Sequence, residues 1–181
     1  MFKMIDLYSG LGGASEAMFS SPDWEIRRIE NNPELADIPH TCMVDVPVIA
    51  RSEEHWTFYG MDSRNIHLLW ASPPCVEFSQ GYNAPGPKAK REGRAFEPDM
   101  ELLEAAIMIR EMWKPKFWVI ENVVGAIKHF EPYLGEPTQI LGSFVLWHNL
   151  PDIVLPRDFI HTKEDNLKGT PSHLRSNYRA L

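Results

Sequence analysis

The stretch FKMIDLYSGLGGASEAMF, residues 2–19, contains the pattern that decides the fold class. Its first six residues are mostly apolar and predict a short buried strand. Three glycines follow at Gly10, Gly12 and Gly13, and residues 14–19 are rich in helix formers. The order of strand, glycine turn and helix is typical of the first unit of a Rossmann-like α/β fold.

Apolar runs farther along the chain predict more strands of the same sheet, at residues 24–30, 65–71, 117–122 and 143–147. A helical pattern starts at Pro98 and ends before Pro115, and its apolar face is formed by Leu102, Ala105, Ala106, Ile109 and Trp113. Residues 81–98 are rich in glycine and proline and are predicted to form a mobile loop, while residues 34–57 give no clear element. Strands that alternate with helices predict a doubly wound, mostly parallel sheet.

The composition is that of one globular domain with a single core, since 44% of the 181 residues are hydrophobic. We expect residues 1–150 to form this domain and residues 151–181 to form an irregular C-terminal segment. Two cysteines and the lack of a secretory segment favour the reducing cytoplasm, and no apolar run is long enough to span a membrane. The net charge of −7 opposes wholesale binding of nucleic acid, but a local basic cluster is formed by Lys88, Lys90, Arg91 and Arg94.

The glycine turn is a candidate ligand site, because glycines adopt positive φ and allow a ligand to approach the backbone. Asp6 opens the turn and no Lys or Arg lies between Asp6 and Phe19, which disfavours a phosphate. A carboxylate suits the ammonium and sulfonium groups of S-adenosylmethionine better. Glu30 could accept hydrogen bonds from ribose hydroxyls, and Asp62 from an adenine amino group. The alternatives are a glycine turn without a ligand and, for Asp62, an ordinary turn aspartate.

Cys75 is a candidate nucleophile, in the stretch WASPPCVEFSQ at residues 70–80. Pro73 and Pro74 each fix φ and would present the thiol in one direction. The alternative is a buried, inert cysteine, which is the commoner role of a lone cysteine. None of the histidines falls in a motif that would support a Cys-His hydrolase, and no His and Cys cluster has metal-ligand spacing.

Glu121 and Asn122 end the very apolar run FWVI, residues 117–120. Partial desolvation would raise the pKa of the Glu121 carboxyl, so that it could hold a proton near neutral pH and donate it to a ring nitrogen. The alternative is an acid that caps or stabilises the fold. Each of these polar groups follows a predicted strand, at the sheet edge where such folds bind ligands.

Taken together and in this order, DLYSGLGG, ASPPCVEFS and ENV resemble the motifs of C5-cytosine DNA methyltransferases, over residues 3–125. The resemblance implies that Cys75 attacks C6 of a flipped-out cytosine in DNA while Glu121 hydrogen-bonds N3 and the exocyclic amine. C5 then takes the methyl group of S-adenosylmethionine, which leaves S-adenosylhomocysteine. Residues 1–150 would be the catalytic domain, and no metal is implied.

The resemblance also implies which residues contact each ligand. The cofactor pocket would be lined by Asp6, Tyr8, Ser9, Gly10, Leu11, Gly12, Gly13, Glu30, Asn31, Asp62 and Pro73. The cytosine and its DNA would meet Pro74, Ser79, Asn122, Val123, Lys88, Lys90, Arg91 and Arg94. The last four belong to the family's mobile catalytic loop and would grip backbone phosphates as this loop closes.

The chain departs from the family pattern downstream. The family usually carries Gln-x-Arg-x-Arg after Gly-x-Pro, whereas Gly135, Pro137 and Gln139 are followed by no arginine in residues 140–144. Arg157 is one candidate replacement. The large target-recognition region and the final helix are also missing. We therefore expect a truncated form, a minimal phage-type enzyme, or one half of a split enzyme from a phage or a restriction-modification system, acting with low intrinsic sequence specificity.

Two other functions stay open on the sequence alone. The chain could be a catalytically impaired subunit that binds DNA or cofactor, as a homodimer or with a complementing subunit. It could also be an NAD-dependent oxidoreductase, since a nucleotide could bind the same glycine turn. Covalent trapping by 5-fluorocytosine separates the first from an active enzyme, and binding of S-adenosylhomocysteine against NAD separates the second.

Overall fold

A computed structural model describes residues 1–52, 57–58 and 60–151 of the chain. Its main feature is a seven-stranded sheet in the order β3-β2-β1-β6-β7-β9-β8. The strands of this sheet are β1 (Phe2–Leu7), β2 (Trp24–Glu30), β3 (Thr41–Met43), β6 (Leu68–Ala71), β7 (Phe117–Val123), β8 (Gln139–Leu141) and β9 (Phe144–His148). The first five strands in the spatial order pair in parallel, whereas β9 runs antiparallel to both β7 and β8. The predicted mostly parallel α/β sheet is confirmed.

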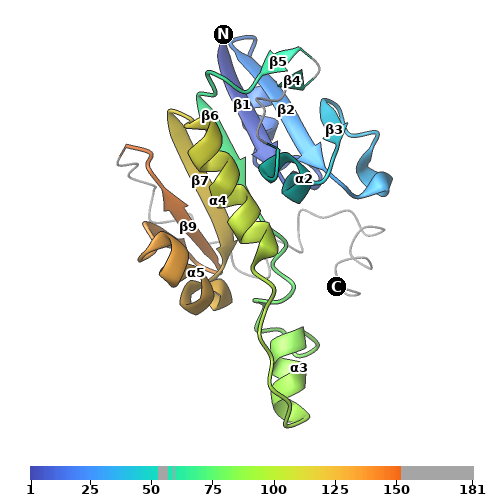
Figure 1. Ribbon diagram of the computed structural model, residues 1–181, viewed down its shortest axis with the longest axis vertical. Coiled ribbons are helices and arrows are strands. Elements are labelled where there is room, and N and C mark those ends of the chain that lie inside the picture. The colour runs from blue at the N-terminus through green and yellow to red at the C-terminus, as the bar shows by residue number, and fades with distance from the viewer. Residues whose placement is uncertain (53–56, 59, 152–181) are drawn as a thin grey trace.

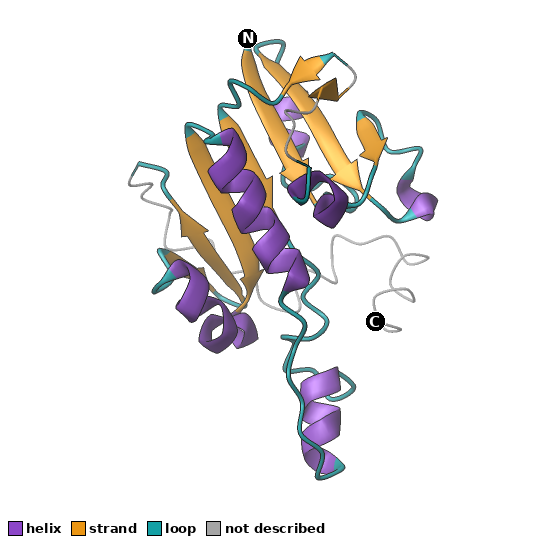
Figure 2. Cartoon of the chain, viewed as in Figure 1, coloured by secondary structure: helices purple, strands orange, loops and turns teal. Residues whose placement is uncertain are grey.

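Helices cover both faces of the sheet, as Figure 2 shows. On one face lie α2 (Val46–Ala50) and α4 (Glu101–Trp113), over a core that includes Ile5, Leu7 and Ile29. On the other face, α1 (Glu16–Phe19) places Met18 against a smaller cluster that includes Met4 and Ile26. Alternate residues of β1 therefore feed two separate cores, as expected for a doubly wound sheet.

The remaining elements are short. They are the 3₁₀ helices η1 (Pro33–Leu35) and η2 (Val124–Ala126), the helices α3 (Pro85–Arg91) and α5 (Ile127–Leu134), and an antiparallel pair formed by β4 (Thr57–Phe58) and β5 (Met61–Asp62). Among the described residues, none of the helices combines the length and the apolar character that a bilayer crossing requires.

Two sequence predictions were wrong in detail. Residues 85–91 form helix α3 instead of a loop, because Pro85 and Pro87 lie in its first turn, where a missing N–H costs little, and the good helix formers of residues 88–91 complete it. Helix α4 begins at Glu101, three residues after Pro98, and its buried face includes Leu103 in place of Leu102. Figure 1 shows α3 well away from the sheet, beyond the carboxyl ends of the parallel strands.

The C-terminal end of α4 agrees with the sequence. Lys114 adopts a left-handed conformation with φ of 47° just before Pro115, which cannot continue a helix. The strand predicted at 117–122 extends to Val123, and the one predicted at 65–71 begins only at Leu68. The predicted C-terminal segment lies outside the described residues apart from Pro151.

Candidate active site

The candidate site is built at one edge of the sheet, where the parallel strands end. The register pairs Leu7 with Ala71 and Ala71 with Ile120, so β1 and β6 end at the level of Ile120, one residue before Glu121 of β7. The glycine turn and the Cys75 loop therefore leave the sheet beside Glu121. This is the edge at which parallel α/β sheets bind their ligands.

The glycine loop, residues 8–13, is attached to the end of β2 by Glu30. The Gly10 N–H donates to Glu30 Oε2 at 2.8 Å, and Glu30 Oε1 accepts from the Asn31 and Asn32 N–H groups at 2.9 Å each. Gly10 and Gly12 have φ of 52° and 80°, values that side chains strongly disfavour. The predicted residues Ser9, Leu11 and Gly13 lie in the same loop, so the loop and Glu30 with Asn31 form one unit.

Tyr8 fixes the start of this loop to helix α4. Its backbone also has a positive φ, 58°, and its hydroxyl donates to the Leu102 carbonyl at 2.7 Å. Burial, with smaller contributions from the charges of Asp45 and Glu101, raises the pKa of the Tyr8 hydroxyl. The hydroxyl thus remains a neutral hydrogen-bond donor at physiological pH.

Asp6 lies underneath the glycine loop. Its side chain is only 1% exposed, and Oδ2 accepts from the Ser15 hydroxyl at 2.8 Å. Burial raises the pKa of Asp6 to about 7, although the Ser15 hydrogen bond and the positive charge of Arg28 act in the opposite direction. The Asp6 carboxyl group is therefore enclosed by the protein. A direct contact with the ammonium group of a cofactor would require it to face solvent, which it does not.

The interpretation of Asp62 as a cofactor contact was wrong. Asp62 belongs to β5, and Figure 1 draws β5 beside the N-terminus, at the opposite end of the strands from the glycine loop. Its carboxylate pairs with Arg64 at 2.6 Å, and this partner, with some help from the charge of Lys3, holds the Asp62 pKa below its usual range. It is the ordinary turn aspartate of the alternative interpretation.

Asp45 lies at the end of the sheet where Asp62 was expected to lie. It follows β3, precedes α2 as its N-cap residue, and its Oδ1 accepts from Asn31 Nδ2 at 3.2 Å. Its charge also raises the Tyr8 pKa, which brings it to the same end of the sheet as the glycine loop. The signal in the sequence was the short apolar run CMV that ends on an acid just before Val46-Pro47.

The Cys75 loop leaves β6 through Pro73 and Pro74, and Cys75 is exposed as a residue although its thiol is partly desolvated. Asn122 ties this loop to β7, because its Nδ2 donates to the Pro73 carbonyl at 2.9 Å while its Oδ1 accepts from the Val123 N–H at 2.9 Å. Burial raises the pKa of the Cys75 thiol, and the charge of Glu121 raises it further. The two predicted catalytic groups therefore lie close enough to influence each other.

Glu121 is partly buried near the end of β7. Burial raises the pKa of its carboxyl, and a hydrogen bond from the Ser72 hydroxyl lowers it in part. Ser72 is itself oriented by Trp70, whose indole N–H donates to the serine oxygen at 2.8 Å. Neither residue was identified from the sequence, where WASPP gave no sign of a polar relay. A proton shift from Cys75 to Glu121 would leave a thiolate beside a neutral acid.

Gly125 joins the two walls of this site and was not identified from the sequence either. A Cβ atom on Gly125 would lie 2.0 Å from the Phe78 carbonyl oxygen, so only glycine lets η2 approach the Cys75 loop this closely. Phe78 in turn packs edge-on against Phe130 of α5, with ring centroids 4.9 Å apart.

A cavity of about 680 Å³ opens between the end of the Cys75 loop, α3 and α5. The predicted residues Ser79, Lys90, Arg91 and Arg94 line it, whereas Lys88 does not. Arg91 lies 3.8 Å from the centre of the Tyr82 ring, and Arg94 is paired with Glu92. Lys128 and His129 of α5 also line the cavity and were missed, because they lie far from the basic cluster in sequence.

The neighbour of Glu121 in the sheet is apolar, and residues 140–144 contain no arginine. Residue 121 pairs with Leu146 of β9, and β8 occupies the outer edge of the sheet. Arg157 lies outside the described residues. Within the described ranges there is also no group of three or more His, Cys, Asp or Glu residues placed to hold a metal ion.

The sequence profile of a family described as C-5 cytosine-specific DNA methylase matches residues 2–141. The chain is similar to the type II methyltransferase M1.HphI of Haemophilus parahaemolyticus, with 25% identity over 131 residues that cover 69% of this chain and 33% of the relative. It is also similar to the type II methyltransferase M.AquIA of Picosynechococcus sp., with 28% identity over 148 residues, 76% of this chain and 56% of the relative. The chain thus matches about a third of one relative and just over half of the other.

Among solved structures, the fold resembles that of an E. coli protein described as a DNA modification methyltransferase encoded within a prophage. The TM-score is 0.53 with 18% identity, and the match covers 95% of this chain and 56% of the other. At this level of identity the likeness concerns the fold.

Proposed function

Because the chain belongs to the C-5 cytosine-specific DNA methylase family, we propose that it methylates C5 of cytosine in DNA with Cys75 as nucleophile and Glu121 as acid. One observation carries the proposal. The Cys75 loop follows β6, Glu121 lies near the end of the neighbouring strand β7, and the charge of the Glu121 carboxyl acts on the thiol, while partial desolvation raises the pKa of both groups. We place this reaction in the cytoplasm, on bacterial or phage DNA.

The chemistry divides between these two groups. The Cys75 sulfur forms a bond to C6 while Glu121 donates a proton to N3, so that electron density collects on C5. S-adenosylmethionine, when bound, supplies the methyl group that C5 takes. Loss of the C5 proton to a water molecule, cleavage of the sulfur–carbon bond with release of the Cys75 thiolate, and return of the N3 proton to Glu121 then restore the aromatic ring. Glu121 is suited to both proton transfers because burial favours its neutral form.

The residues of the glycine loop fit this cofactor. The Ser9 hydroxyl oxygen is buried without a hydrogen-bond partner among the described residues, and it lies in the loop where a ligand would supply one. Glu30, which already orders the loop, ends β2 where a ribose would lie. We assign the adenine amino group to Asp45 in place of Asp62.

The basic cavity is the proposed contact for the DNA backbone. Lys90 comes from α3 and Lys128 from α5, so the cations of the cavity surround it from two segments. A local positive surface of this kind would attract phosphates in spite of the acidic total charge.

Covalent trapping tests the mechanism. DNA that contains 5-fluorocytosine should form a denaturation-stable adduct with the wild-type chain and cofactor, because fluorine at C5 blocks release of the enzyme. The adduct should be absent for Cys75→Ser, reduced at least about a hundredfold in rate for Glu121→Gln, and unchanged for Cys42→Ser, the matched control at the buried cysteine. An adduct that persists in Cys75→Ser contradicts the assignment.

A catalytically impaired subunit of a split enzyme is the second candidate. Leu146 lies beside Glu121, and the chain matches only part of each relative's length. This candidate predicts that the chain binds S-adenosylhomocysteine but forms no adduct alone, and that a complementing chain restores the adduct.

A further inference from the structure

Arg28 is an unusual residue for the middle of a buried strand. It lies in β2 beside Asp6 of β1, and its side chain is only 2% exposed. A buried guanidinium is costly unless its N–H groups are paired. Its interactions therefore indicate what the protein gains from it.

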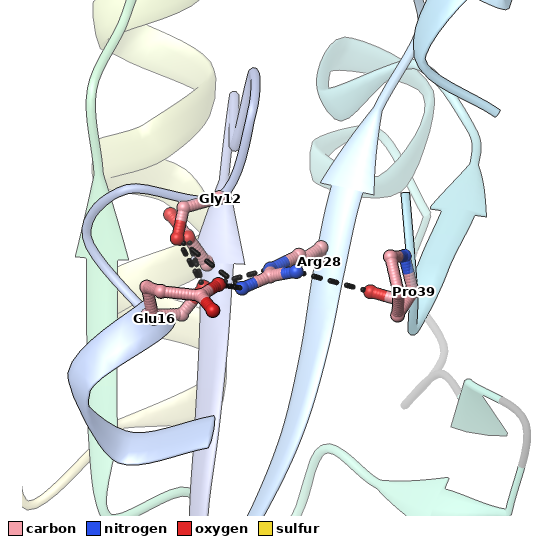
Figure 3. A network of polar contacts seen from close by, with 6 residues as sticks. Gly12, Glu16, Arg28 and Pro39 are labelled. Atoms are coloured by element: carbon pink, nitrogen blue, oxygen red, sulfur yellow. Dashed lines mark hydrogen bonds and ion pairs between the residues drawn. The ribbon is translucent and has the colours of Figure 1, made fainter. Parts of the chain in front are cut away.

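Most of these interactions go to the segment that follows β1. Arg28 Nε donates to the Ser15 hydroxyl at 2.9 Å, and Nη2 donates to the Gly12 carbonyl at 3.2 Å and to Glu16 Oε2 at 2.8 Å. On its other side, Nη1 donates to the Pro39 carbonyl at 3.3 Å. Figure 3 shows the side chain reaching from β2 to the glycine loop in one direction and to Pro39 in the other.

The network continues to Asp6. Since the Ser15 oxygen accepts from Arg28, its own proton is available for Asp6 Oδ2, at 2.8 Å. Two buried ionisable groups, the Arg28 guanidinium and the Asp6 carboxyl, are thus joined through one hydroxyl under the loop. The ring of Phe19 lies 5.2 Å from the guanidinium carbon and closes the site from the helix α1 side.

The backbone at Gly12 lies so close to the Arg28 guanidinium that there is no room for a side chain at position 12. A Cβ atom at this position would lie 2.3 Å from Arg28 Cζ, and its φ of 80° is in the left-handed region. The loop can therefore follow this path only with glycine at position 12 and with its carbonyl directed at Arg28.

We propose that Arg28 is a positioning residue for the cofactor: its guanidinium holds the glycine loop, through Gly12 and Ser15, in the binding conformation before the cofactor arrives. Glu30 holds the same loop from the end of the same strand, through the Gly10 N–H. A loop fixed at two points loses less conformational freedom on binding, which raises affinity without any contact between Arg28 and the ligand. The inference rests on the proposed use of S-adenosylmethionine.

The test compares Arg28→Lys with Arg27→Lys, the same change one residue earlier on the opposite face of the strand. Amide hydrogen exchange of residues 8–14 is measured on the ligand-free protein, with α4 as internal reference. The affinity for S-adenosylhomocysteine is measured by calorimetry. Arg28→Lys should accelerate exchange in the loop and weaken binding, each by about tenfold or more, whereas Arg27→Lys should change neither. A folded Arg28→Lys with wild-type loop exchange and wild-type affinity overturns the proposal.

Chemical rescue separates positioning from general stability. Arg28→Ala should regain affinity for S-adenosylhomocysteine with millimolar guanidinium chloride and not with sodium chloride at the same concentration.

If both Arg28 variants fail to fold, Glu16→Ala decides, because Glu16 is 68% exposed and its loss removes one partner of the guanidinium. Faster loop exchange in Glu16→Ala supports the proposal and unchanged exchange overturns it. If the wild-type chain binds no S-adenosylhomocysteine, the proposed function fails, and loop exchange alone still decides the role of Arg28.

Discussion

The glycine loop and the Cys75 loop leave neighbouring strands of one sheet, but the protein supports them differently. The glycine loop is held from below by Arg28 and Ser15, from the side by Glu30, and at its start by Tyr8. The Cys75 loop is fixed near its ends, by the hydrogen bond from Asn122 to the Pro73 carbonyl and by the contact at Gly125. Beyond Gln80 the chain runs out to α3, away from the sheet.

This difference matches what each loop is proposed to do. A cofactor loop gains from being ordered in advance, because the ligand is small and rigid placement raises affinity. A segment that must admit DNA and a flipped base gains from freedom to move. If the two ends of the site are independent, a change at one should leave the other intact.

The largest effect is expected from Gly125→Ala. The added Cβ would push the Phe78 carbonyl and move the Cys75 loop, and displacements of about 1 Å cost about a hundredfold in rate. Methyl transfer to DNA should fall by this factor, while the affinity for S-adenosylhomocysteine stays within about twofold. Transfer of a radiolabelled methyl group to DNA measures the rate, and calorimetry measures the affinity for S-adenosylhomocysteine. A parallel loss of cofactor affinity would mean that the two ends are one unit.

Asp45→Asn tests the cofactor end alone. Loss of a charged acceptor should weaken S-adenosylhomocysteine binding by about tenfold, and the trapping rate at saturating cofactor should stay near that of the wild type. Asp62→Asn is the matched control and should bind normally, because Asp62 lies with Arg64 and Lys3 at the opposite end of the strands. Weaker binding in Asp62→Asn than in Asp45→Asn would reverse our correction.

Lys128→Gln tests the DNA end through its salt dependence. Removing one phosphate contact should lower the slope of log affinity for DNA against log salt by about 1, with a few-fold loss of affinity at moderate salt. Lys116→Gln serves as control, since Lys116 lies before β7 at the far end of the strand. Equal slopes for wild type and Lys128→Gln would show that Lys128 in this cavity does not contact the DNA backbone.

The smallest effect concerns the pH dependence of stability. Because burial raises the pKa of Asp6 to about 7, the folded protein binds a proton there that the unfolded chain has already lost. The stabilising contribution is therefore complete below about pH 4 and is lost as pH rises through about 7. Relative to Asp6→Asn, the wild-type free energy of unfolding should fall by about 1 kcal/mol between pH 6 and pH 8. Denaturant titrations of both proteins at each pH measure this difference. A wild-type free energy of unfolding that rises relative to that of Asp6→Asn between pH 6 and pH 8 would contradict the assignment.

The sequence predicted those parts of the molecule whose signal is local. Neighbouring residues alone predict the apolar runs that form β1, β2 and β7. They also predict the end of α4 at Lys114, just before Pro115. The motif residues Cys75 and Glu121 were identified because each lies just after a short apolar run of the sequence.

What the sequence did not predict depends on tertiary contact. Arg28 looks like one of several strand charges until β1 pairs with β2 and brings Gly12 to it. Gly125 looks like a helix breaker until Phe78 is packed against it, and Asp62 resembles Asp45 until the strand order separates them. Helix α3 was hidden because Pro85 and Pro87 were interpreted as breakers, although prolines are tolerated in a first turn.

Arg28 reaches the loop from a strand that the ribosome delivers later, and this ordering has a consequence for biogenesis. Every glycine of the loop has been made by residue 13, but the guanidinium arrives with residue 28 and the Pro39 carbonyl later still. The nascent glycine segment therefore stays unsupported until β1 and β2 have paired. If the chain binds S-adenosylmethionine as proposed, only chains in which β1 and β2 have paired can bind it, and a cell rich in this cofactor would stabilise those newly made chains.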